Sequence, residues 1–248
     1  AVQNIGYGSF DLNDASGANM GTFKANELLL AISHARKVKH FAFGINLKFA
    51  QSNIENYQSS AVLFDFGGAF IHPEKDLRVG LLVKNFGFAL SSYTSTENFE
   101  MPLDVQFGFS IKPERMPLRF SLTAHHLQKL FGIAYQDPSN VGKVDALGNP
   151  IEEEIGFGDE LSRHIVFGGE LVFSKNFNFR LGYNFLRRRE LALDTRLGTV
   201  GLSWGFMMRI KKLEIAYSRS AQFINKGLNS FTLTLNTKEF FKKKRVIE

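Results

Sequence analysis

Apolar and polar residues alternate with a period of two along most of this sequence, and many of the apolar residues are phenylalanine. In the segment 41–50, one alternating set is apolar throughout and consists of Phe41, Phe43, Ile45, Leu47 and Phe49. The other set is small or polar and consists of Ala42, Gly44, Asn46, Lys48 and Ala50. Because successive side chains of a β-strand point to opposite faces of the sheet, this pattern predicts strands with one apolar and one polar face.

The same alternation recurs along the whole chain and predicts about twelve strands, most of them near the ~9–11 residues that a tilted strand needs to cross a bilayer. Clear examples start at Leu103, Phe177 and Phe231. Less regular examples start near Val2, Thr22, Ser60, Leu77, Leu118, Ser162, Leu197 and Leu213.

One of the predicted strands changes phase in its middle. Leu81 and Val83 share a face, whereas Phe86 and Phe88 fall on the opposite parity. We therefore expect a β-bulge at Lys84–Asn85, where one extra residue resets the register.

Composition decides what kind of sheet these strands form. The chain of 248 residues contains 26 Phe, and its mean hydropathy is only −0.11 because apolar and polar residues alternate. Its richest apolar run, Leu28–Ile32, is far too short for a transmembrane helix. A soluble β-sandwich also alternates, but it rarely sustains Phe-rich faces over so many strands. We therefore predict an all-β fold, a transmembrane antiparallel up-and-down β-barrel of a bacterial outer membrane.

The predicted connections are of two alternating kinds. Short turns are expected at Ala35–Val38, Pro73–Asp76, Pro113–Pro117, Ser174–Asn176 and Ile210–Lys212. Longer polar links are expected at Asn13–Gly21, Gln51–Tyr57, Ser91–Glu100, Leu127–Glu160, Arg188–Thr195 and Gln222–Leu228. Outer-membrane barrels have short periplasmic turns and long extracellular loops. An even number of strands then leaves both visible termini on the periplasmic side, where we expect them. The barrel is assigned to residues 1–241, and residues 242–248 form a basic periplasmic tail.

The charged residues of the polar face have both signs in comparable numbers. They are Lys48, Asp65, Lys84, Asp104, Lys112, Arg119, Glu170, Arg180, Arg209 and Glu214. A selectivity filter would be a ring of one sign, so this mixture favours a mutually neutralising network that fills the lumen. The formal charge of +6 comes with no nucleic-acid-binding motif, and we expect no nucleic-acid partner.

The sequence offers little for catalysis or metal binding, and we predict no enzyme activity, no cofactor and no metal site. Ser121 and His125 share parity on one predicted strand, but four residues separate them by roughly 13 Å, too far for a hydrogen bond. His125 and His126 are adjacent strand residues that would point to opposite faces, so they are not expected to chelate one ion. The chain contains no cysteine.

The predicted extracellular loop at residues 127–160 is the longest link. It contains the apolar residues Leu130, Phe131, Ile133 and Tyr135. Such residues on an exposed loop indicate either packing over the barrel mouth or a protein partner, and the sequence leaves both open. We take Leu130, Phe131 and Tyr135 as the candidate partner-binding residues.

Several segments, in the same order along the chain, resemble the PorQ family of outer-membrane barrels of the Bacteroidetes type IX secretion system, which is related to the FadL- and PorV-type barrels. The resemblance covers nearly the whole chain. Its segments include Tyr7–Asp11, Phe43–Lys48, Leu82–Gly87, Arg119–Leu127, Arg163–Gly168, Ser174–Asn184, Arg187–Leu191, Ser203–Phe206 and Arg209–Lys212.

The resemblance implies a non-enzymatic role in a cell-surface attachment complex that joins secreted cargo to lipopolysaccharide. The implied partners are a PorZ-like surface protein and, through it, the sortase PorU and the shuttle barrel PorV, together with outer-membrane lipid. The family carries a plug-like region and about two more strands before the first matched segment. We therefore expect about 14 strands in the full FadL-like protein, and Ala1 is not expected to be its mature N-terminus. The alternative function is FadL-like transport of hydrophobic small molecules across the outer membrane.

Overall fold

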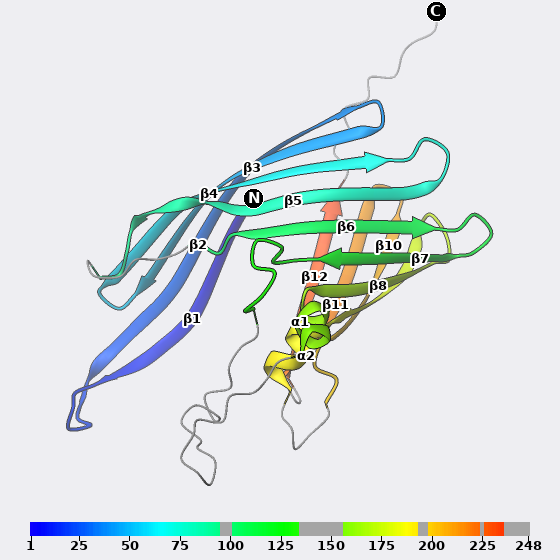
Figure 1. Ribbon diagram of the computed structural model, residues 1–248. Coiled ribbons are helices and arrows are strands. Elements are labelled where there is room, and N and C mark those ends of the chain that lie inside the picture. The colour runs from blue at the N-terminus through cyan, green and yellow to red at the C-terminus, as the bar shows by residue number, and fades with distance from the viewer. Residues whose placement is uncertain (95–100, 134–155, 193–197, 224–225, 236–248) are drawn as a thin grey trace, which may run out of the picture. The chain divides into compact units, whose positions relative to one another are not determined.

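The computed structural model describes residues 1–94, 101–133, 156–192, 198–223 and 226–235. In these residues, twelve antiparallel strands form one sheet whose order, β1 to β12, is the order of the sequence (Figure 1). β1 and β12 are the two ends of this described order. The prediction of an all-β, up-and-down architecture with about twelve strands is confirmed.

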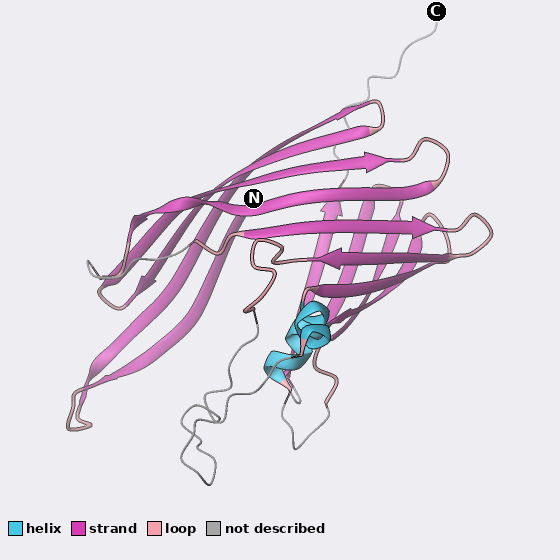
Figure 2. Ribbon diagram, viewed as in Figure 1, coloured by secondary structure: helices cyan, strands magenta, loops and turns pink. Residues whose placement is uncertain are grey.

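The strands are β1 (Val2–Asn13), β2 (Asn19–Val38), β3 (Phe41–Ile54), β4 (Tyr57–Ile71), β5 (Asp76–Ser91), β6 (Asp104–Lys112), β7 (Leu118–Ala124), β8 (Ile165–Val172), β9 (Phe177–Asn184), β10 (Leu202–Ile210), β11 (Leu213–Phe223) and β12 (Lys226–Leu235). Two short helices, α1 (Phe157–Arg163) and α2 (Phe185–Leu191), interrupt the strands in the described residues (Figure 2). No helix in these residues is long and apolar enough to cross a membrane.

The chain divides into two compact units. Unit 1 consists of Ala1–Ile71 and Val79–Phe107, and unit 2 consists of His72–Arg78 and Gly108–Glu248.

In unit 1, one face of the sheet is apolar and exposed, and the opposite face is polar. Phe43 is 56% exposed, whereas the side chain of Lys48 on the opposite face of the same strand is only 11% exposed. The cross-strand register extends the apolar face, because Leu47 lies opposite Ile32 on β2 and opposite Phe64 on β4. A sheet that folds in water has the reverse distribution, with its apolar face buried.

In unit 2, too, large apolar side chains of the strands are exposed. Leu181 lies opposite Trp204, and these two residues are 52% and 41% exposed. On β12, Phe231 and Leu233 are 69% and 61% exposed. In the described part of the whole chain, the buried hydrophobic residues are only Ala25, Leu63, Val200 and Met207. The large apolar side chains therefore lie on the surface instead of forming a core.

The predicted change of phase in β5 is confirmed. Leu81 and Phe86 are both exposed, although their numbers differ in parity. Between them, Asn85 adopts a left-handed backbone with φ of 58°, and its N–H donates to Asp65 Oδ1 at 2.9 Å. Two residues further on, a Cβ added at Gly87 would lie 2.0 Å from the carbonyl oxygen of Val62, so only glycine fits where β5 passes β4. Asn85 is therefore the residue that resets the register.

Several predicted turns are confirmed, and others are wrong. The links after β6, β8 and β10 are short and lie where the sequence placed them. However, β2 continues to Val38, so the hairpin of β2 and β3 turns at Lys39–His40 and not within Ala35–Val38. The link predicted at Gln51–Tyr57 is only the pair Glu55–Asn56. Its polar residues belong to the ladder, where they face other polar side chains, as Ser52 faces Ser59.

The two helices replace predicted strand or loop residues. The strand expected from Ser162 begins at Ile165, because α1 occupies the residues before it. The strand expected from Leu197 begins at Leu202, and α2 occupies the start of the link expected at Arg188–Thr195. The link predicted at Gln222–Leu228 is short, since β11 ends at Phe223 and β12 begins at Lys226. The predicted tail at residues 242–248 lies outside the described residues.

Substitutions at Asn85 can separate the effect of its left-handed backbone on stability from the effect of its side chain. We expect Asn85→Val to lower the free energy of unfolding by about 1–2 kcal/mol more than Asn85→Gly does, because a branched side chain is strained at this φ and glycine is not. Urea unfolding in lipid vesicles, followed by the fluorescence of Trp204, measures the difference. Equal losses for the two variants would contradict a backbone requirement at this position.

Candidate functional site

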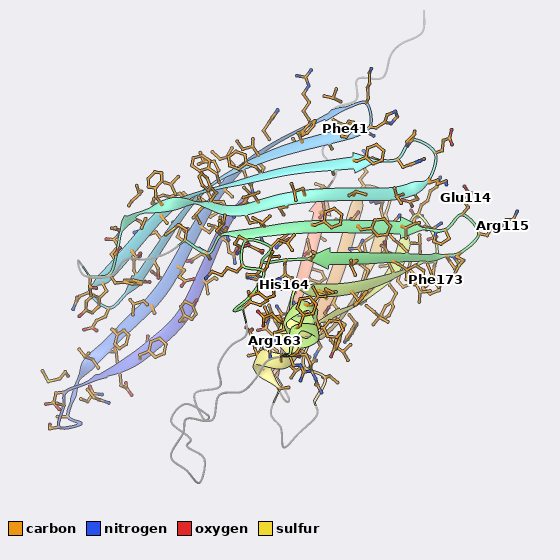
Figure 3. All side chains as sticks on the ribbon, in the orientation of Figure 1. Phe41, Glu114, Arg115, Arg163, His164 and Phe173 are labelled. Atoms are coloured by element: carbon orange, nitrogen blue, oxygen red, sulfur yellow. The ribbon has the colours of Figure 1, made fainter. Side chains whose placement is uncertain are left out.

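The two described flanks of the long link between β7 and β8 are joined by a buried histidine. His164 follows α1 and is only 3% exposed. Its Nδ1 lies 2.7 Å from the carbonyl oxygen of His125, and its Nε2 lies 3.3 Å from that of Leu130. In the reverse direction, the N–H of His125 donates to the carbonyl oxygen of His164 at 2.9 Å. One imidazole thus holds the chain leaving β7 against the chain entering β8 (Figure 3).

A second contact fixes the same flanks further from the strands. Glu160 of α1 is 6% exposed, and its Oε1 accepts a hydrogen bond from the N–H of Ile133 at 3.0 Å. A hydrogen bond to a charged acceptor contributes about 1.5–3 kcal/mol. The segment around Leu130 is therefore tied to α1 as well as to His164.

Ion pairs attach α2 to α1. Asp159 lies 2.8 Å from Arg163 one helical turn away and 2.8 Å from Arg189 of α2. The side chain of Asn184 caps α2 by accepting from the N–H of Arg187 at 2.9 Å, and Arg187 in turn donates to Ser220 of β11 at 2.7 Å. We call residues 125–133 together with α1 and α2 the loop base. Its contacts join the chain that leaves β7 to the chain that enters β8, and they join α2 to Ser220 of β11.

The loop base presents an exposed group of large apolar side chains. Leu130 and Phe131 are 61% and 69% exposed, and Phe157 and Leu161 of α1 are 69% and 50% exposed. The ring centroids of Phe131 and Phe157 are 6.4 Å apart. We call these four residues the apolar cluster. It is the candidate functional site of the chain.

Sequence reasoning identified half of this cluster. Leu130 and Phe131 were predicted partner-binding residues, and the structure places both in it; Tyr135 lies outside the described residues. Phe157 and Leu161 were missed because the segment was read as the end of a loop. Their spacing of four residues, which puts two side chains on one face of a helix, is the signal that could have found them.

The predicted geometry of the neighbouring histidines is wrong. β7 ends at Ala124, so the alternation of strand side chains does not extend to His125 and His126. His126 has a positive φ of 57°, and the Nδ1 atoms of the two rings are 2.5 Å apart. The described residues contain no group of three or more metal-binding side chains that could hold an ion.

The polar face of unit 1 contains a tightly connected charged group. Lys48 Nζ lies 2.7 Å from Asp65 Oδ1 and donates to Asn85 Oδ1 at 2.7 Å. Asn46 donates to the other oxygen of Asp65 at 3.1 Å. Two of the charged residues that the sequence placed on this face are thus brought together. Asp104 accepts from Gln106, and Lys84 forms no ion pair with any described residue.

In unit 2, three of the predicted charges form a row across neighbouring strands. Arg119 lies opposite Glu170, and Glu170 lies opposite Arg180. Arg119 is 2.7 Å from one oxygen of Glu170, and Arg180 is 3.0 Å from the other. The sequence missed Asp76, which lies 2.6 Å from Arg119.

A second, more exposed pair in unit 2 joins Arg209 and Glu214 across one turn. Arg209 is 2.6 Å from Glu214, and their side chains are 48% and 31% exposed. Lys112, the remaining predicted charge, forms no ion pair with a described residue. Of the six charges that the sequence predicted in unit 2, five therefore lie in ion pairs with opposite charges.

Comparison of the chain with models of protein families and with curated proteins finds no match.

The row of charges in unit 2 predicts that substitution of two different glutamates lowers the free energy of unfolding by unequal amounts. We expect Glu170→Gln to lower the free energy of unfolding by about 2–3 kcal/mol, because it leaves two arginines beside a group without charge. Glu214→Gln, in the exposed pair, is the matched control and should cost less than about 1 kcal/mol. Urea unfolding measures both, and a larger loss for Glu214→Gln would refute the assignment.

The contact of Glu160 with Ile133 predicts the dynamics of the loop base. We expect Glu160→Ala to raise the hydrogen-exchange rate of the Ile133 amide roughly 10- to 100-fold, since a hydrogen bond of this kind contributes about 1.5–3 kcal/mol. Glu190→Ala is the control, because Glu190 is an exposed glutamate of α2. Exchange mass spectrometry distinguishes the variants, and unchanged exchange in Glu160→Ala would show that the contact contributes nothing.

Proposed function

We propose that this chain is a non-enzymatic outer-membrane protein that anchors a protein partner at the cell surface. The observation that carries the proposal is the apolar cluster, which is exposed although the segments that bear it are held in place by buried contacts. The strands supply the membrane anchor in this proposal, and the loop base supplies the docking surface.

The burial pattern supports the membrane anchor. Keeping a Phe or Leu side chain in water forgoes about 1.5–3 kcal/mol relative to burying it, and such residues cover one face of each unit. A lipid environment removes this cost, while hydrogen bonding between neighbouring strands satisfies the backbone. The polar opposite face, with Lys48 and Asp65 paired on it, then faces away from lipid.

The geometry of the loop base supports docking to a protein. Protein interfaces have apolar, aromatic-rich centres and polar rims. Phe131 and Phe157 provide an aromatic centre, and Arg189 and Asp159 lie on the adjacent helices as the polar rim. Because the segment is already held by His164 and Glu160, little conformational entropy is lost when a partner binds.

The resemblance to the PorQ family gives the proposed partner and pathway. We propose that the chain acts in the type IX secretion system of Bacteroidetes and docks a PorZ-like surface protein. Through that protein it would be linked to the sortase PorU and the shuttle barrel PorV, which attach secreted cargo to lipopolysaccharide. In this proposal the loops are extracellular and the termini are periplasmic.

Substitution of the apolar cluster tests this function. We expect the triple variant Leu130→Ser, Phe131→Ser, Phe157→Ser to reduce recovery of the PorZ-like partner at least tenfold in affinity purification from native outer membrane, because interface aromatics contribute most of the binding energy. Quantitative mass spectrometry of the purified complex measures the recovery.

A matched control lies at the other end of β8. Phe173 is 63% exposed, close to the value for Phe131, and Figure 3 shows it far along the strand from His164. Phe173→Ser should leave recovery unchanged. Recovery of the partner with the triple variant at the level of the native protein would refute the proposed docking site.

Transport of hydrophobic small molecules is the second candidate function. The phase change at Asn85 favours it, because a break in strand regularity is where a barrel wall can open sideways. This function requires movement of solute across the membrane, whereas anchoring does not. Uptake of a labelled hydrophobic solute into vesicles that contain the protein separates the two.

A further inference from the structure

A cavity of about 350 Å³ lies in unit 1, on the face of the sheet that carries Lys48 and Asp65. Its size is within the ~300–1,000 Å³ of typical ligand sites. The strand register shows how its floor is built from two rows of residues. One row is Ile5, Glu27, Ser52 and Ser59, and the next is Gln3, Leu29, Ala50 and Ala61. Tyr93, Met101 and Pro102, which lie outside these two rows, also line the cavity.

The row that contains Glu27 is the polar end of this cavity. Tyr93 donates its hydroxyl to Ser52 Oγ at 2.6 Å, and Ser59 donates to the carbonyl oxygen of Ser91 at 2.9 Å. The carboxylate of Glu27 lies on the same row, directly opposite Ser52 in the register. A ligand group placed here would meet hydroxyl groups and a carboxylate.

The other end of the cavity is mostly apolar. Leu29, Ala50 and Ala61 belong to the second row together with Gln3, and Leu63 follows Ala61 on the same face of β4. Leu63 is 8% exposed, so its side chain is packed against its neighbours at this end. The small side chains of Ala50 and Ala61 leave the space open, since a larger residue at either position would fill it.

The charges around the cavity disfavour an anionic ligand. Glu27 is the charged residue among the described residues that line it. The lysine nearest in the register, Lys48 opposite Leu63, is 2.7 Å from Asp65 and also donates to Asn85. This ammonium group is therefore neutralised, and a carboxylate ligand would face Glu27 with no counter-charge.

We propose that the cavity binds a single-chain amphiphile with an uncharged, hydroxyl-bearing head group, such as a monoacylglycerol. The head group donates to Glu27 and exchanges hydrogen bonds with Ser52 and Tyr93. The acyl chain runs along Leu29 and Ala61 to Leu63. Hydroxyl groups suit this end because they can donate to the carboxylate of Glu27 and both donate to and accept from serine and tyrosine hydroxyls. The site is independent of the apolar cluster, which belongs to unit 2.

Two probes with the same chain test the proposal. The protein in lipid nanodiscs is titrated with 1-lauroylglycerol and with laurate, and binding is followed by native mass spectrometry. We expect lauroylglycerol to bind at least tenfold more tightly than laurate. Glu27→Gln should reduce this preference to less than threefold by strengthening the binding of laurate, because it removes the negative charge that laurate meets.

Filling the cavity supplies the control for location. Ala61→Phe should abolish lauroylglycerol binding, whereas Ala69→Phe should retain it. The two alanines lie on the same face of β4, roughly 26 Å apart at 3.3 Å per residue. Heat-modifiable migration on gels verifies that each variant is folded. Equal or tighter binding of laurate by the native protein, no binding of either probe, or unchanged binding in Ala61→Phe would overturn the proposal.

Discussion

Hydrogen bonding between neighbouring antiparallel strands satisfies the backbone of the sheet, and the alternation of side chains then decides which residues each face of the sheet presents. Each strand has an apolar side and a polar side, and the cross-strand register aligns these sides across neighbours, as Leu47 lies between Ile32 and Phe64. With so few apolar residues buried among those described, the fold does not depend on a conventional core. It depends on keeping this alternation in register over long strands.

The phase change in β5 shows how that register is maintained. A slip of one residue would move every following side chain to the wrong face. Asn85 absorbs the slip by adopting a left-handed backbone, and Asp65 accepts the N–H that would otherwise lose its partner in the ladder. Lys48 then contacts both residues. The charged group on the polar face therefore stabilises the irregularity that keeps Phe86 on the apolar face.

The sequence predicted the strands well, because a period of two is repeated in each of them, and it predicted the bulge, because Leu81 and Phe86 differ in parity. It failed where local chemistry competes with periodicity. Polar residues such as Ser52 were read as a loop, yet they continue the ladder beyond the apolar part of the strand. The short helix α1 was missed, since its seven residues contain one helical spacing of apolar residues, that of Phe157 and Leu161, at the end of a segment read as a loop. Partners distant in sequence, such as Asp76 for Arg119, are set by register and side-chain reach, which no local pattern contains.

The same alternation explains why the two proposed binding features are so different. Within the strands, the apolar side chains of the exposed face belong to the proposed membrane anchor, so the proposed ligand site on the polar face is made partly from small residues, as at Ala50 and Ala61. A protein-binding surface instead has to leave the alternation, and the chain does so after Ala124, where His126 takes a positive φ. Beyond that point Phe131 is exposed for a reason other than strand parity. His164 and Glu160 hold it in place, and this support is what makes the apolar cluster a surface of defined shape.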